Sequence, residues 1–115
     1  MAAKVDPRTT PGAWGEFLRA RGTVAASRGR GNDGYHDLAQ SANVFDLLGE
    51  RYQTALSQLA LGRLAARSGA RSIAVRTLDQ AGATFRELGA RRDAEDVEAA
   101  RGLTSEPGTG DFIGA

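Results

Sequence analysis

The sequence predicts an all-α protein built from antiparallel helix-turn-helix repeats. Three observations support this fold class. Gly22, Gly62 and Gly102 recur at a spacing of 40 residues, other residues repeat in the same register, and five segments carry apolar residues at helical spacing. A fixed period of this length is typical of stacked supersecondary units, which bury a core only against their neighbours.

The repeat includes large apolar residues as well as small ones. The shift that superimposes these glycines also places Leu38 on Leu78, Phe45 on Phe85 and Leu48 on Leu88. It aligns further small and polar pairs: Ala26 with Ala66, Gly29 with Gly69, Gln40 with Gln80, and Gly49 with Gly89. We therefore expect about five helices in two and a half units.

The first helix is expected over residues 11–28. Thr10 offers an N-cap and Pro11 fits the first helical position. Glycines at 29, 31 and 34 are expected to end this first helix. A second helix is expected over 33–48, with Gly49 as its left-handed C-terminal cap.

Three more helices complete the expected repeat. The third, over 51–68, is apolar almost all round, which predicts packing on several sides. Ser72 is expected to cap the fourth, which carries an apolar stripe from Ile73 to Leu88. The fifth, over 91–102, is more polar, as expected for the end of a repeat stack.

Composition limits the range of functions. The 115 residues support one small domain, they include no cysteine, and no apolar run is long enough for a membrane span or a signal peptide. We therefore expect a cytoplasmic protein. The segment 1–31 carries six basic side chains against two acidic ones, within an overall charge of +1, so DNA binding by this basic third remains an alternative.

These residues resemble the tetratricopeptide repeat family, in the long-period variety of bacterial signalling proteins and transcriptional regulators. The central unit carries the motif at Leu61, Gly62 and Ala65 in one helix, and at Ala74 and Leu78 in the next. The aromatic positions of the family are missing, and no proline closes the units. The resemblance covers about residues 11–103 and implies a right-handed α-α superhelix.

The resemblance also implies a binding groove lined by the first helix of each unit. In this sequence the candidate groove residues are Arg19, Thr23, Arg63 and Arg67. An arginine pair there could hold a carboxylate or a phosphate in bidentate fashion. The alternative, which the sequence favours, is that these are ordinary solvated side chains.

Small residues are expected where paired helices approach closely. The candidates for these packing positions are Gly22, Gly62, Ala74, Ala81 and Gly102.

No pattern of catalytic, cofactor-binding or metal-ligating residues stands out. His36 is the only histidine, and zinc would need further ligands. Gly108-Thr109-Gly110 is not followed by the lysine of a phosphate loop. Trp14 and Tyr52 lie on the apolar stripes of their helices, which favours core positions over exposed anchors for a partner.

The expected organisation is a flexible lead over residues 1–9, a repeat domain over 10–103, and a linker over 104–115 into a further domain. The expected function is a noncatalytic protein-protein interaction or sensory scaffold of a larger bacterial regulator, without cofactor. Its partner would be a protein, a peptide or another domain of the same chain, and a homodimer is reasonable because repeat ends expose apolar surface. A helical regulatory segment of a nucleotide cyclase is the other alternative.

Overall fold

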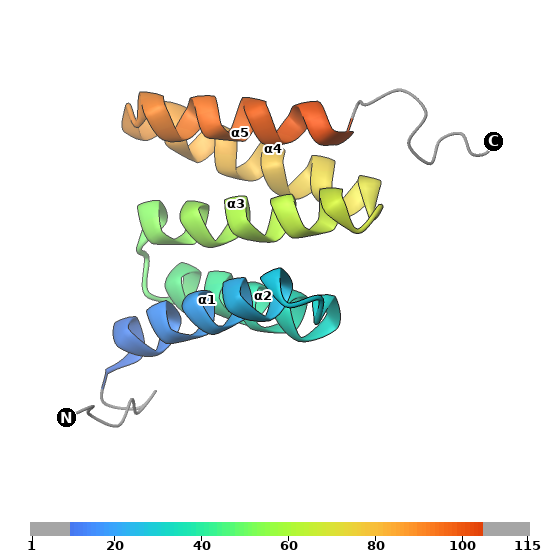
Figure 1. Cartoon of the computed structure of the whole chain (residues 1–115). Coiled ribbons are helices and arrows are strands. Elements are labelled where there is room, and N and C mark those ends of the chain that lie inside the picture. The colour runs from blue at the N-terminus through green and yellow to red at the C-terminus, as the bar shows by residue number, and fades with distance from the viewer. Residues whose placement is uncertain (1–9, 105–115) are drawn as a thin grey trace.

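In a computed structural model, which describes residues 10–104, the chain is all helical, as predicted. The five helices are α1 (Pro11–Ser27), α2 (Gly31–Leu47), α3 (Arg51–Arg67), α4 (Arg71–Leu88) and α5 (Arg91–Thr104). They stack in chain order, with α1, α3 and α5 in one layer and α2 and α4 behind them (Figure 1). The expected lead over residues 1–9, and the expected linker from residue 105 onward, lie outside the described residues.

The same turn follows each of the helices α1 to α4. Gly29, Gly49, Gly69 and Gly89 all have φ between 72° and 82°, a left-handed conformation that only glycine adopts without cost. The residue after each glycine donates its backbone N–H to the carbonyl five residues before it, at 2.8–3.0 Å. This bond is the six-to-one contact of the Schellman motif. The left-handed turn therefore recurs every 20 residues, whereas the side-chain pattern recurs every 40 residues.

This turn corrects two expected helix boundaries. Gly31 and Gly34 do not interrupt helical structure, since α2 begins at Gly31 and Gly34 is buried inside α2. Ser72 is not a cap, because α4 begins at Arg71 with Ala70 in the capping position. In each case the helix resumes two residues after the left-handed glycine.

Small residues bring α1 close to α2 and α3 close to α4. A Cβ added to Gly22 would lie 2.9 Å from Cγ of Leu38, and one added to Gly34 would lie 2.9 Å from the carbonyl oxygen of Gly22. At Gly62 the added Cβ would lie 2.5 Å from Cδ2 of Leu78. Ala74 and Ala81 are fully buried in α4.

Gly102 does not share this environment, although it occupies the same register. It is exposed near the end of α5, and an added Cβ would meet nothing within 4 Å. The expectation that Gly102 packs against a neighbouring helix is therefore wrong for the described residues. Its counterparts Gly22 and Gly62 are each covered by the following helix, and among the described residues no helix follows α5.

The largest buried cluster lies where α3, α4 and α5 meet. It consists of Ala55, Leu59, Leu78, Ala81, Phe85, Val97 and Ala100. Tyr52, which we expected in the core, is 41% exposed and contacts the Phe85 ring edge-on, while its hydroxyl donates to Asp93 at 2.8 Å. That hydrogen bond raises the pKa of Tyr52. Trp14 is half-buried.

Candidate binding groove between α1 and α3

An open depression of about 620 Å³ lies between α1 and α3. The α1 side contributes Glu16, Arg19, Ala20 and Thr23, and the α3 side contributes Leu56, Leu59, Ala60 and Arg63. Side chains three or four residues apart on a helix share a face, which explains why α1 presents residues 16, 19, 20 and 23 together. We call this depression the α1–α3 groove.

Three of the four predicted groove residues line this site. Arg19, Thr23 and Arg63 surround the α1–α3 groove, whereas Arg67 is exposed at the end of α3 and is not among the lining residues. The floor is apolar, through Leu56 and Ala60 and the small exposed part of Leu59. The sequence offered no specific signal for this floor, because a leucine in a repeat is equally consistent with a buried core position.

Arg19 is largely engaged by the protein itself. Its guanidinium donates to the Gln53 carbonyl at 3.3 Å, to Oε1 of Gln53 at 2.8 Å and to Oγ of Ser57 at 3.2 Å. It also lies 5.4 Å from the centroid of the Phe45 ring. Burial lowers the pKa of Arg19, and the Glu16 charge opposes that shift. These contacts leave Arg19 poorly placed to hold a ligand in bidentate fashion.

Two buried serines extend the Arg19 contact across three helices. Ser57 and Ser41 are fully buried with their hydroxyl oxygens 2.8 Å apart, and Ser41 donates to the Gly15 carbonyl at 2.8 Å. A hydroxyl has one proton to donate, so Ser57 must donate to Ser41 while accepting from Arg19. The result is a directed chain from Arg19 through Ser57 and Ser41 to Gly15, which joins α1, α2 and α3.

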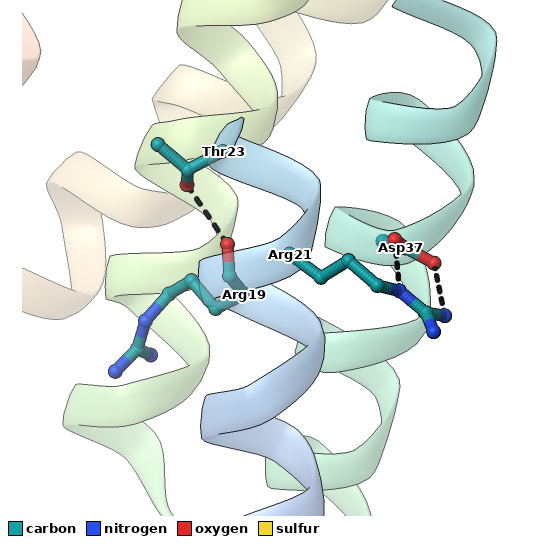
Figure 2. Close-up of polar contacts among 4 residues, drawn as sticks. All are labelled: Arg19, Arg21, Thr23 and Asp37. Carbon is teal, nitrogen blue, oxygen red and sulfur yellow. Dashed lines mark hydrogen bonds and ion pairs between the residues drawn. The ribbon is translucent and has the colours of Figure 1, made fainter. Parts of the chain in front are cut away.

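Figure 2 shows Arg21 leaving α1 on the opposite side from Arg19. Arg21 donates to both carboxylate oxygens of Asp37 on α2, at 2.8 and 3.0 Å. The Asp37 side chain is only 8% exposed, and the bond from Arg21 holds the pKa of Asp37 below its ordinary value. Arg21 is thus neutralised locally, and it points away from the α1–α3 groove.

Glu16, Thr23 and Arg63 are the remaining polar members of the groove. The Thr23 hydroxyl donates to the Arg19 backbone carbonyl at 2.8 Å (Figure 2), which leaves its oxygen able to accept. Arg63 is exposed and makes no hydrogen bond or ion pair with another described residue. It is therefore the cation of this groove that is available to a ligand.

Residues 10–104 hold no group of three or more metal-ligand side chains. Within the same range, no helix is long and apolar enough to cross a bilayer. Every buried side-chain nitrogen or oxygen of these helices has a hydrogen-bond partner.

In comparisons with known proteins, no family model matches the chain, and neither the curated proteins nor the solved structures give a match. The tetratricopeptide relationship therefore stays a resemblance.

Proposed function

We propose that the chain is a noncatalytic interaction module that holds a peptide segment of a protein partner in the α1–α3 groove. The observation that carries this proposal is the combination of an apolar floor with one uncommitted cation. Leu56 and Ala60, which are partly buried, can contact an apolar side chain of the peptide, and Arg63 can pair with a carboxylate beside it. The favoured ligand is thus a segment with leucine-like and acidic residues.

The setting that the resemblance implies is part of the same proposal. A repeat module of a larger bacterial signalling or transcriptional regulator would bind its partner here and pass the signal to another domain.

The contacts of the basic side chains do not favour the alternative of a DNA-binding surface. Within the basic segment 1–31, Arg19 is held by α3 and Arg21 by Asp37. Among the described residues of this segment, Arg28 and Arg30 are exposed and make no side-chain hydrogen bond or ion pair with another described residue. Tight binding of duplex DNA generally requires a larger set of free cations.

A peptide panel tests the proposed groove. Short fluorescein-labelled peptides containing leucine and glutamate would be titrated with the protein, alongside the same peptides with glutamine in place of glutamate. We expect the glutamate peptides to bind more tightly in fluorescence polarisation, and Arg63→Glu to weaken them by about tenfold or more, as loss of an interfacial charge pair does.

Arg67→Glu is the matched control, because it makes the same charge change on the same helix outside the groove. Equal weakening by both variants would show a nonspecific charge effect. Binding that neither variant changes would place the peptide site elsewhere.

A further inference from the structure

Helix α1 has three distinct faces, and among residues 10–104 one of them is contacted by another helix only through the ion pair of Arg21 with Asp37 of α2. Gly15, Leu18, Gly22 and Ala25 are its buried residues. Glu16, Arg19, Ala20 and Thr23 line the α1–α3 groove. Trp14, Phe17, Arg21 and Val24 form the third face, which we call the α1 seam.

The α1 seam is exposed although it is largely apolar. Phe17 is 39% exposed, Val24 is 45% exposed, and the Arg21 side chain is 52% exposed. The Trp14 and Phe17 rings stack at 5.5 Å, and the Arg21 guanidinium lies 5.0 Å from the centroid of the Phe17 ring. Two aromatic rings and a valine along one exposed helix face are typical of an interface.

The repeat shows what normally covers this face. In the repeat register, Phe17, Arg21 and Val24 correspond to Ser57, Leu61 and Leu64 of α3, which are at most 8% exposed. Leu61 and Leu64 pack there against Leu38 of the preceding helix, α2. The α1 seam is therefore a surface whose counterpart in α3 is covered by a helix.

The spacing of the seam residues suits a helix that runs alongside α1. Positions 14, 17, 21 and 24 alternate in steps of three and four, which is the spacing of the contact positions in a coiled coil. Ala13 flanks the seam with a small side chain that permits close approach. A partner helix can therefore lie along α1 over about three turns.

The seam is complementary to a second copy of itself in the antiparallel direction. If two copies of α1 cross at residue 19, Trp14 of one lies opposite Val24 of the other, and Phe17 lies opposite Arg21. Each Arg21 then meets an aromatic ring rather than another arginine. Its charge is already balanced by Asp37, so pairing buries no isolated charge.

The other end of the stack has a different character. The exposed side chains of α5 include Glu95 and Glu98, and Arg101 of the same helix pairs with both Glu98 and Asp79. Charged residues close a repeat stack against further helices. Leu103 of α5 is also 45% exposed, so apolar side chains are exposed at both ends of the described helices, and the stacked pair of aromatic rings distinguishes the α1 end.

We propose that the α1 seam binds the seam of a second copy of this chain, in an antiparallel pair of α1 helices centred on residue 19. The dimer is two-fold symmetric and isologous. It leaves both α1–α3 grooves free, because groove and seam are different faces of α1. The contact involves one helix from each chain, so we expect a small interface and a dimer that dissociates at micromolar concentrations.

Disulfide cross-linking tests the register directly, since the sequence contains no cysteine. The double variant Trp14→Cys/Val24→Cys places a cysteine pair face to face between two copies. Within one chain the two positions are about 15 Å apart along the helix, too far for a disulfide. Under mild oxidation we expect a dimer on a non-reducing gel for the double variant and a monomer for Val24→Cys alone.

Sedimentation equilibrium from about 1 µM to 1 mM, a range that brackets weak and tight dimers, tests the proposal without cysteines. We expect the unmodified chain to approach twice the mass of one 12.1 kDa chain as its concentration rises. Phe17→Arg sets four arginines against one another across the dimer and should weaken association by about tenfold or more, as loss of a central contact residue does. Leu47→Arg, at an 87% exposed site outside the seam, should leave it unchanged.

We expect each variant to keep its helices, because every substituted side chain is at least partly exposed. Circular dichroism of each variant checks this. A chain that stays monomeric at all concentrations would overturn the proposal. A dimer that Phe17→Arg and Leu47→Arg affect equally would do the same, as would equal cross-linking by the single and double cysteine variants. None of these measurements depends on peptide binding at Arg63, so this proposal and the proposed function fail separately.

Discussion

At the scale of single residues, the same glycine in the repeat has two different roles. Gly62 allows α3 and α4 to approach, since a Cβ there would overlap Leu78. Gly102 has the same register but open surroundings. A repeated residue therefore shows a repeated backbone position, while its energetic role depends on whether a neighbouring helix is present.

Substitution of these two glycines should have opposite effects on stability. Gly62→Leu overpacks the contact with Leu78, and we expect it to lower the free energy of unfolding by about 1–3 kcal/mol. Gly102→Ala removes a flexible residue from an exposed helix and should raise that free energy by about 0.5–1 kcal/mol. Urea unfolding followed by circular dichroism measures both.

Gly102→Leu controls for the size of the new side chain. It should be close to neutral or mildly stabilising, because nothing lies within 4 Å of the added Cβ. Destabilisation by this variant equal to that of Gly62→Leu would contradict the packing argument.

At the scale of the helix, the two junctions between successive units differ in chemistry. At the first, Arg19 of α1, Ser41 of α2 and Ser57 of α3 form the hydrogen-bonded chain. The repeat register places Leu59, Ala81 and Val97 at the corresponding positions of the second junction, and all three belong to the large apolar cluster. One backbone arrangement therefore accommodates either a polar or an apolar junction.

Exchanging the polar junction for the apolar one tests this equivalence. The triple variant Arg19→Leu/Ser41→Ala/Ser57→Val should fold, with a free energy of unfolding equal to or up to about 2 kcal/mol above that of the parent chain, since it removes the three linked side chains together. The Gln53 side chain that loses its bond from Arg19 is only partly buried. Ser57→Val alone leaves Arg19 and Ser41 short of a partner and should cost about 1–3 kcal/mol.

Thermal unfolding of the parent, the single and the triple variants separates these effects. If the triple variant is as destabilised as Ser57→Val, the polar network stabilises the first junction in a way that the apolar set cannot replace. That result would contradict the proposed equivalence of the two junctions.

At the scale of the whole molecule, the stack has no single central core. The large cluster joins α3, α4 and α5, while Leu38, Leu61 and Leu64 form a smaller one between α2 and α3. In such a stack each helix is stabilised by its immediate neighbours, so the local stability depends on the position along the chain.

Amide hydrogen exchange should therefore vary along the stack. We expect the slowest exchange in α3 and α4, which lie inside the stack, and faster exchange in α1, which lies at one end of it (Figure 1). Mass spectrometry at low protein concentration, where the proposed dimer is dissociated, measures this order. Uniform exchange across all five helices would instead indicate one cooperative unit.

The sequence by itself determined the helical class, the number of helices and their approximate ends. These features depend on local signals: evenly spaced glycines that adopt a left-handed turn, and apolar residues at helical spacing. Such signals act within one helix and its cap, so they can be recognised without knowledge of the neighbours.

Only the tertiary structure decided which side chains are available for binding. Arg19, Arg63 and Arg67 are similar in sequence, yet one is held by α3, one lines the groove freely and one lies outside it. Tyr52 and Gly102 likewise differ from their expected environments because burial depends on which helix lies opposite. Contacts between helices join residues far apart in the chain, and the apolar spacing within a single segment does not indicate which helix lies opposite it.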